Sequence, residues 1–335
     1  MAHLSTMSIP YPWLEPYRQS VANIFKQGRF PHALLLTGQS GMGKAAFADY
    51  LAQLLLCEQP VEGESPCGQC SACTWFKAGS HPDYRYVSFE LDDKGKLRKT
   101  IVVDQIRKLA GDLALKSHAG GYKVAVITPA DAMNINASNS LLKTLEEPSD
   151  NTVLILVSGQ PGLLLATLRS RCQQFRIDVQ DKGPVLQWLS GQLDMREPEI
   201  YLKLAENAPL EALRLAQQDA IENRSKHFAD LVDILDGRAA PLTVALAWSK
   251  DEDMQAIQWL RDWLMDLLRI RMTGQKDAVR SLDVVDGLET LAERLDSKVM
   301  FEQLDRINRT LQLAASGLNR QLMTEDILLA WAAQG

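Results

Sequence analysis

The segment Gly38-Gln39-Ser40-Gly41-Met42-Gly43-Lys44-Ala45 decides the fold class of this 335-residue chain. It follows a strand-like run, Ala33–Thr37, and opens a helical pattern, Lys44–Leu56. A G-x-x-x-x-G-K spacing between a strand and a helix predicts a loop whose backbone N–H groups and lysine bind phosphate. A glycine-rich turn with a surface lysine is the weaker alternative. We therefore expect a P-loop α/β fold, with phosphate contacts from Gly38, Gly41, Gly43 and Lys44.

The alternation of strand-like and helical segments continues along the first half of the chain. Lys123–Ile127 and Thr152–Val157 are rich in β-branched residues and apolar on both faces, while Asp83–Val87 and Gln174–Ile177 are weaker candidates. Strands that are buried on both faces and separated by helices indicate a parallel sheet covered on each side. The helical patterns are Lys44–Leu56, Val103–Leu113 and Ala137–Glu147.

The second half of the chain has the pattern of an all-helical region. Beyond about Asp178 the strand patterns stop, and apolar residues recur at helical spacing, which is typical of helices that pack a core. We expect the last helix to be capped by Thr324, after a break near Gly317. One apolar stripe comprises Ile257, Leu260, Trp263, Leu264, Leu267 and Leu268, and another comprises Phe301, Leu304, Ile307 and Leu311.

Composition and charge exclude several classes of protein. With 46% hydrophobic and 23% charged residues, the chain is neither disordered nor collagen-like, and its length suggests two or three domains. A net charge of −6 does not fit a strongly basic nucleic-acid binder, so we expect any action on DNA to go through partner proteins. No apolar run is long enough to span a membrane, and we expect no secretory signal, because the N-terminal residues lack a basic stretch followed by an apolar core. We expect a cytoplasmic protein without membrane partners.

The chemistry of nucleotide hydrolysis is missing at two places. The residue after the loop lysine should carry a hydroxyl for Mg²⁺, and it is Ala45. A second strand should end in acidic residues, but Thr128 and Pro129 follow Lys123–Ile127. Asp131 is the nearest carboxylate, and capping of a turn is a better interpretation for it than metal binding. We therefore expect no hydrolysis, while ATP or ADP binding through the loop stays open.

Four of the five cysteines, Cys57, Cys67, Cys70 and Cys73, lie within 17 residues. Four thiolates on one short segment are typical of a structural Zn²⁺ site, with no position left for a reacting water. The C-x2-C-x2-C run also resembles an iron–sulfur pattern, but the following Cys-Pro is absent. Zinc is the favoured interpretation, ahead of a cluster or free thiols. We interpret His81 as a local packing residue.

The turn Leu168-Arg169-Ser170-Arg171-Cys172 precedes the last candidate strand. An arginine on such a turn can project from the domain edge, and its planar guanidinium suits a phosphate of a neighbouring subunit. From the pattern alone, a surface ion pair is the more common outcome for Arg171.

Together these motifs resemble the bacterial clamp-loader family of AAA+ proteins. The run Leu141-Leu142-Lys143-Thr144-Leu145-Glu146-Glu147-Pro148 is the most specific of them. The resemblance is strong over about the first 180 residues, whereas the helical remainder is similar only in character. The matching segments are His32–Gly38, the loop to Lys44, the four cysteines with His81-Pro82-Asp83, Val103–Arg107, Asn139–Pro148 and Ser170–Cys172.

The resemblance implies an AAA+ module with a five-stranded parallel sheet, followed by an all-α lid and an all-α collar. It implies a RecA-like domain at residues 1–177 with a zinc module at 57–73, a lid at 178–220 and an oligomerisation collar at 221–335. The implied partners are motor subunits of the gamma/tau type and a delta subunit, in a five-subunit ring. Such a ring loads a sliding clamp onto primed DNA.

Departures from the family pattern favour a subunit that does not hydrolyse ATP. Motor members carry a hydroxyl residue after the loop lysine, an acidic pair after the third strand and a lid arginine, where this chain has Ala45, Thr128-Pro129 and Leu210. The implied role is a stator of the DNA polymerase III clamp loader, without polymerase or ATPase activity, whose Arg171 completes a neighbour's ATP site in trans. The alternatives are an active ATPase motor of the same loader and a metal–sulfur redox protein on a nucleotide-binding fold.

Overall fold

The computed structural model describes residues 11–28, 30–62, 64–92, 94–192, 197–250, 254–275, 279–314 and 319–334. Contacts divide the chain into two compact units, Met1–Trp188 and Leu189–Gly335. The first unit is α/β, and the described residues of the second are helices and their connections, as expected for the two halves of the chain. The boundaries of a lid at 178–220 and a collar at 221–335 stay predictions.

A five-stranded parallel sheet forms the centre of the first unit, which confirms the predicted fold class. The strand order is β2-β3-β4-β1-β5, and each neighbouring pair is parallel. The strands are β1 (Ala33–Thr37), β2 (Tyr84–Val87), β3 (Lys123–Ile127), β4 (Thr152–Val157) and β5 (Gln173–Arg176). The helices are η1 (Pro12–Leu14), α1 (Glu15–Lys26), α2 (Lys44–Leu56), α3 (Ser71–Lys77), α4 (Val103–Ala114), η2 (Ala130–Ala132), α5 (Ile135–Glu146), η3 (Pro161–Leu163), α6 (Ala166–Arg169) and α7 (Lys182–Ser190).

Strand β1 lies between β4 and β5, and all five of its residues are buried. Leu34 is in register with Ile155 of β4 on one side and with Gln173 of β5 on the other. A parallel strand covered on both faces needs apolar residues at every position, which explains the uninterrupted Ala-Leu-Leu-Leu run. The phosphate loop follows β1 directly, so it begins between the carboxyl ends of β4 and β5.

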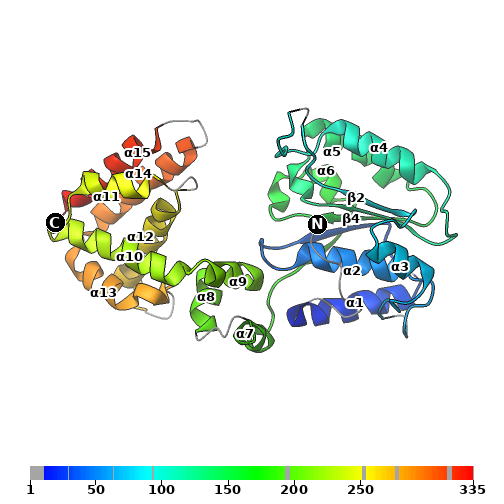
Figure 1. Ribbon diagram of the computed structural model, residues 1–335, viewed down its shortest axis with the longest axis horizontal. Helices are drawn as coiled ribbons and strands as arrows, with labels where there is room; N and C mark the ends of the chain where they lie inside the picture. The colour runs from blue at the N-terminus through cyan, green and yellow to red at the C-terminus, as the bar shows by residue number, and fades with distance from the viewer. Residues whose placement is uncertain are drawn as a thin grey trace. The chain divides into compact units, whose positions relative to one another are not determined.

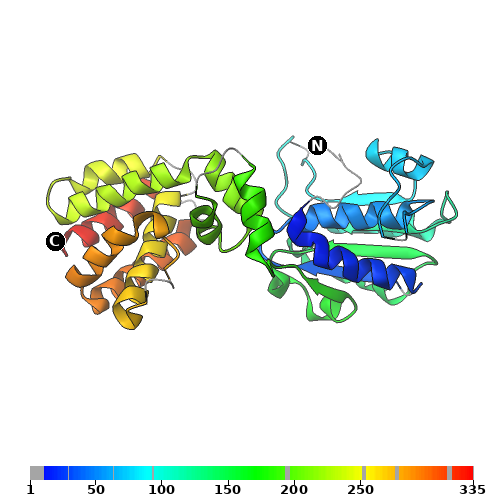
Figure 2. The same cartoon turned by 90° about the horizontal axis from the view of Figure 1, so that it is seen from below.

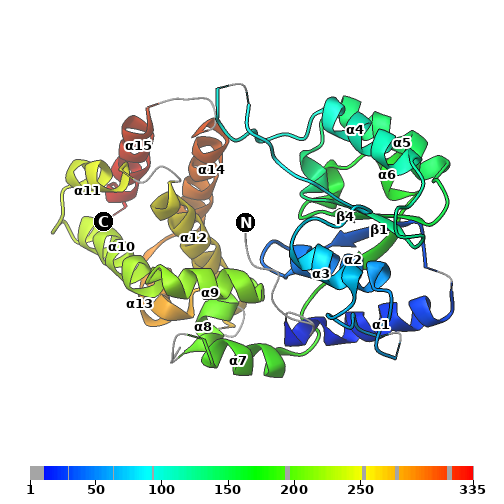
Figure 3. The same cartoon turned by 45° about the vertical axis from the view of Figure 1, so that its right-hand side comes forward.

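Helices cover the sheet on both faces. Helices α4, α5 and α6 lie on one face, and α1 and α2 lie on the other (Figures 1 and 3). Helices α1 and α2 run beside each other over their face (Figure 2). One buried cluster joins alternate residues of the strands to the inner faces of α4, α5 and α6 and includes Leu35, Ile106, Leu141, Leu145, Leu168 and Cys172.

Most predicted elements are present, with shifted ends. Helix α5 begins at Ile135, two residues before the predicted start, because the Asn134 side chain accepts a hydrogen bond from the Ala137 N–H and caps it. Strand β5 covers Gln173–Arg176 instead of Gln174–Ile177. The sequence patterns did not single out helix α1, which has 12 residues, or helix α3, which has seven residues and includes Cys73.

Among its described residues, the second unit has helices as its only regular secondary structure, which confirms the predicted all-helical half. No helix of the described residues is long and apolar enough to cross a membrane. After α7 the helices are α8 (Pro198–Leu204), α9 (Pro209–Gln217), α10 (Ala220–Leu235), α11 (Pro241–Trp248), α12 (Gln255–Thr273), η5 (Leu282–Val284), α13 (Val285–Arg294), α14 (Ser297–Ala314) and α15 (Arg320–Ala332).

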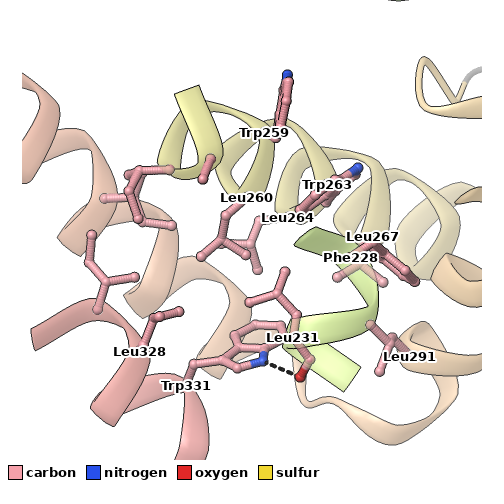
Figure 4. Close-up of a cluster of buried hydrophobic side chains, with 14 of the residues drawn as sticks. Phe228, Leu231, Trp259, Leu260, Trp263, Leu264, Leu267, Leu291, Leu328 and Trp331 are labelled. Atoms are coloured by element: carbon pink, nitrogen blue, oxygen red, sulfur yellow. Dashed lines mark hydrogen bonds between the residues drawn. The ribbon is translucent and has the colours of Figure 1, made fainter. Parts of the chain in front are cut away.

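The core of the second unit gathers residues of α10–α15. The predicted stripe on α12 is buried there, with Trp263 near Phe228 of α10 (Figure 4). The Trp331 indole N–H donates to the Leu231 carbonyl oxygen at 3.1 Å, which ties α15 to α10 (Figure 4). The prediction of Thr324 as the last N-cap is wrong, because Asn319 accepts the N–H groups at the start of α15. Gly317 lies outside the described residues.

A buried ion pair joins α10 to η5 in the second unit. Arg224 Nε donates to Asp283 at 2.7 Å, and the two side chains are 4% and 0% exposed. The Arg224 guanidinium also lies over the Trp259 and Trp263 rings, at 5.6 and 5.2 Å from their centroids. Its Nη2 donates to the Ser281 hydroxyl. These partners offset the cost of burying one cation in an otherwise apolar core.

We expect Asp283→Ala to lower the free energy of unfolding of the full chain by about 3 to 5 kcal/mol, because Arg224 stays buried without its counter-charge. Urea denaturation monitored by tryptophan fluorescence measures the loss. The control is Glu222→Ala on the same helix, which removes an exposed pair with Lys226 and should leave the stability nearly unchanged. Equal stabilities of the two variants would contradict the structural role of the buried pair.

Candidate functional site

The phosphate loop occupies the carboxyl end of β1, as predicted, and two of its glycines are required by the backbone. Gly38 has φ +135°, and a Cβ there would collide with the Ile177 carbonyl oxygen. Gly43 has φ +81°, and a Cβ there would meet the Tyr11 ring. Other residues rarely adopt these conformations. The loop is therefore fitted closely to the chain around it.

The loop lysine contacts its own loop. Lys44 Nζ donates to the carbonyl oxygens of Gly38 and Gln39 at 2.7 and 2.6 Å. The residue is 6% exposed, and burial lowers the pKa of its amine. An incoming phosphate would have to compete with these two carbonyl groups for the ammonium. The loop therefore has the shape of a phosphate site, but the Lys44 ammonium group already donates hydrogen bonds to the loop itself.

Aromatic side chains pack beside the loop, a feature that the sequence patterns did not predict. The Trp13 indole N–H donates to the Met42 carbonyl oxygen at 3.0 Å. The Tyr11 and Trp13 rings are stacked with centroids 4.8 Å apart, and Trp188 packs edge-on against both. These rings hold the loop from outside the G-x-x-x-x-G-K motif. Only the three-dimensional neighbourhood shows them, since Tyr11 and Trp188 are far apart in the chain.

The positions expected to carry hydrolytic chemistry are apolar or differently used. Ala45 is exposed in the first turn of α2 and has no hydroxyl for a metal ion. The Asp131 carboxylate accepts the Gly159 N–H at 2.9 Å, so it holds the loop that follows β4 and not the turn of its own segment that the sequence suggested. Directly after β4, Ser158 is fully buried, and its hydroxyl has no partner among the described residues. The sequence analysis did not single out Ser158, although a polar residue directly after a buried strand is a signal that could have indicated it.

The four predicted metal-binding cysteines lie together. Their Sγ atoms are all within 4.8 Å of one another, and Cys57 and Cys70 have Sγ atoms 4.0 Å apart. Tetrahedral Zn–S bonds of about 2.3 Å place the sulfur atoms about 3.8 Å apart, so the cluster has the dimensions of such a site. All four thiols are free of disulfides. This donor set fits zinc held by Cys57, Cys67, Cys70 and Cys73.

Backbone N–H groups already point at the sulfur atoms. The N–H groups of Cys67, Cys70 and Cys73 donate to the Sγ atoms of Cys57, Cys67 and Cys70. Donation from Gln69 and Cys70 lowers the pKa of the Cys67 thiol to about 6. Burial raises the pKa of the Cys73 thiol, so this ligand depends on a cation to ionise. Such hydrogen bonds orient thiolate ligands in metal sites.

Beside the cluster, His81 is a packing residue in the described structure, as interpreted from the sequence. Its Nδ1 accepts the Asp83 N–H at 3.1 Å, and its ring packs edge-on against Trp75. Phe76 of α3 packs against Tyr84 of β2 with centroids 4.7 Å apart. The cysteine segment is thus attached to the edge of the sheet through aromatic contacts.

Arg171 lies on a tight turn between α6 and β5. Its neighbours Leu168 and Cys172 are buried, with exposed fractions of 0% and 9%, and they fix the turn. The Arg171 side chain is 36% exposed and pairs with Glu146 at 2.6 Å. The surface ion pair considered as the common outcome is therefore present. The guanidinium keeps further N–H groups for a ligand, because an arginine has five.

The phosphate loop and Arg171 lie at opposite edges of the sheet. The loop follows the carboxyl end of β1, whereas Arg171 precedes the amino end of β5, the parallel neighbour of β1. Four- or five-residue strands separate these edges by roughly 15 Å. The predicted site residues thus form three separate places, and Arg171 lies at the opposite end of the strands from the phosphate loop of its own chain. Leu210, at the predicted lid arginine position, is the second residue of α9 in the second unit.

Two family descriptions match most of the chain. The family described as "DNA polymerase III, delta subunit" matches residues 15–181. The family described as "DNA polymerase III, delta subunit, C terminal" matches residues 218–333. The two matches fall on the α/β unit and on the helices that follow it.

Full-length relatives give a consistent result. "DNA polymerase III subunit delta′" of Pseudomonas aeruginosa is 34% identical over 328 residues, which cover 96% of this chain and 97% of the relative. The protein of the same name from Yersinia pestis is 36% identical and covers 96% and 95%. "DNA polymerase III subunit tau" of Bacillus subtilis is 28% identical and covers 89% of this chain but 56% of the relative. Similarity to delta′ is therefore higher and more complete than similarity to tau.

We expect the purified chain to carry about one zinc ion and to be colourless, and we expect Cys70→Ser to lose most of the zinc and several degrees of melting temperature. Elemental analysis and thermal unfolding measure the two effects. The control is Cys172→Ala, which changes a cysteine outside the cluster and should keep the zinc. Iron with visible absorbance, or full zinc content in Cys70→Ser, would contradict the structural zinc site.

Proposed function

The chain belongs to the family of DNA polymerase III delta′ subunits, and we propose that it is the non-hydrolysing stator of a clamp loader. In this role it supplies Arg171 to the ATP site of a neighbouring motor subunit. The motifs resembled the DNA polymerase III clamp-loader family, and the relatives named delta′ confirm that family. The stator role and the arginine in trans are the proposal.

The observation that carries the proposal is a well-formed phosphate loop without hydrolytic side chains. Ala45 replaces the hydroxyl that holds Mg²⁺, and Thr128-Pro129 replaces the acidic pair after the third strand. Lys44 is held by carbonyl groups of its own loop. Backbone N–H groups can still bind a phosphate weakly, so ATP or ADP binding by Gly38, Gly41, Gly43 and Lys44 remains compatible with the role.

The position of Arg171 supports donation to another subunit. It lies at the amino edge of the sheet, away from the phosphate loop of the same chain. A rigid guanidinium with free N–H groups stabilises charge on a transferring phosphoryl group. A neighbour with a complete ATP site is therefore the partner that this edge fits.

The proposed assembly is a five-subunit ring with motor subunits of the gamma/tau type and a delta subunit. The second unit would supply the collar contacts of this ring, and zinc would stabilise the cysteine segment without taking part in catalysis. The ring would load a sliding clamp onto primed DNA in the cytoplasm. The net charge of −6 agrees with contacts to DNA that go mainly through the assembly.

An active ATPase motor of the same loader is the alternative, and two observations favour it. The glycine-rich loop has the expected backbone, and the tau relative is similar over most of this chain. A metal–sulfur redox protein has less support, because the full-length relatives are polymerase subunits.

We expect the isolated chain to hydrolyse ATP no faster than a buffer blank with Mg²⁺, because Ala45 carries no hydroxyl and Thr128-Pro129 carries no carboxylate. Phosphate release by the purified protein measures this. The variant Ala45→Thr should remain inactive, since the acidic pair would still be missing. Steady Mg²⁺-dependent turnover by the wild-type chain would favour the motor alternative.

We expect Arg171→Ala to enter the assembled loader normally and to lower its clamp- and DNA-stimulated ATPase. An arginine supplied in trans contributes roughly 10³–10⁵-fold to the rate at the site it serves. The total ATPase rate of the assembly should therefore fall by the fraction that this one site contributes. The matched control is Arg169→Ala, two residues away on the same turn. Equal ATPase rates for wild type and Arg171→Ala, or an equal loss in both variants, would count against the role of Arg171.

A further inference from the structure

We infer that Glu146 positions the Arg171 guanidinium for its ligand, an inference that rests on the proposed function of Arg171. The carboxylate of Glu146 is the partner that the structure gives to this guanidinium, and the pair lies at the amino edge of the sheet. Glu146 is not a phosphate ligand itself. Its role is to limit the directions in which Arg171 can point.

Two restraints act on the Arg171 side chain. Nη2 pairs with Glu146 Oε1 at 2.6 Å, and Nη1 donates to the Thr167 carbonyl oxygen at 2.9 Å. One restraint comes from the last residue of α5 and the other from α6, so they hold the guanidinium from two sides. Each terminal nitrogen carries a second hydrogen, which leaves N–H groups for an approaching phosphate.

The two elements that hold the pair share one frame. Leu141 and Leu145 of α5 are buried in the same hydrophobic cluster as Leu168 and Cys172, which flank Arg171. The backbones that carry the acid and the base are therefore fixed relative to each other. Because both backbones are fixed, the ion pair with Glu146 also limits where the Arg171 guanidinium can lie.

The charge distribution at this place favours the same arrangement. Glu146 and Glu147 lie at the carboxyl end of α5, where the helix dipole and two carboxylates attract a cation. Glu147 is exposed and makes no ion pair among the described residues. The two adjacent acids differ in their contact with Arg171, and they therefore provide a matched comparison.

Exposed ion pairs contribute little to folding stability, and this one is 36% and 49% exposed. Loss of the Glu146 side chain should leave folding intact while the guanidinium samples more directions. Catalytic groups that lose their orientation lose rate at saturating substrate more than they lose affinity. A positioning role is therefore separable from a structural one.

The experiment measures ATPase of the loader reconstituted from full-length subunits with clamp and primed DNA. The Arg171-dependent rate is defined as the wild-type rate minus the Arg171→Ala rate at saturating ATP. We expect Glu146→Ala to reduce this rate by about 3- to 10-fold with little change in the KM for ATP. We expect Glu146→Gln, which keeps an oxygen acceptor, to retain at least half of it, and Glu147→Ala to retain all of it.

The double variant Glu146→Ala/Arg171→Ala should match Arg171→Ala alone, because Glu146 acts through Arg171. Melting temperatures of all variants should agree within a few degrees. Full activity of Glu146→Ala, a loss in Glu146→Gln as large as in Glu146→Ala, or an additional loss in the double variant would overturn the inference. A rate above wild type in Glu146→Gln would also overturn it, since the carboxylate would then compete with the phosphate.

These outcomes are distinct from failure of the proposed function. If Arg171→Ala leaves the ATPase of the assembly unchanged, then the arginine in trans is wrong and the role of Glu146 fails with it. If Arg171→Ala lowers the rate and Glu146→Ala does not, then only the positioning role fails.

Discussion

Parallel pairing of β1 with β4 and β5 is the constraint on which the rest of the first unit depends. In a parallel sheet, all strands begin at one edge and end at the other, and the connections cross over through helices. The phosphate loop therefore follows the carboxyl end of a strand. The turn with Arg171 and the end of α5 instead lie at the amino ends of the strands. A phosphate-binding loop and an arginine suited to phosphate occur in one chain, and the topology keeps them from serving the same phosphate.

The phosphate loop is part of the packing of the first unit, independently of any nucleotide chemistry. Gly38 approaches the backbone of Ile177, and Gly43 lies under the Tyr11 ring. Trp13 binds a loop carbonyl, and Lys44 binds two more. A larger residue at Gly38 would displace the backbone just after the edge strand β5, and one at Gly43 would displace the Tyr11 ring at the start of α2. Packing requirements of this kind constrain the glycine pattern independently of any nucleotide chemistry, so the motif alone does not identify a motor.

The sequence predicted the features that depend on neighbours in the chain. The apolar run of β1, the glycine spacing and the four clustered cysteines each follow from local chemistry, and the structure contains all three. Features that depend on tertiary contacts were missed. The Trp188 contact with the N-terminal rings and the partner of Arg171 join residues more than 20 positions apart. The cap of α15 was misplaced for a local reason, since Asn319 and Thr324 are both good caps and only the packing of the unit decides between them.

The exposed pair of Glu146 and Arg171 has an arrangement that stability does not explain. The buried pair of Arg224 and Asp283 joins two helical elements, and its loss would leave a charge in an apolar core. Arg171, in contrast, could be solvated by water at little cost. Its carboxylate partner nevertheless comes from a helix anchored on the same core as its own turn, and a backbone carbonyl holds the second nitrogen. A restrained, solvent-facing cation is an advantage when an anion from outside the chain must meet it in one orientation. The side-chain entropy is then lost during folding and not during binding, so binding is stronger.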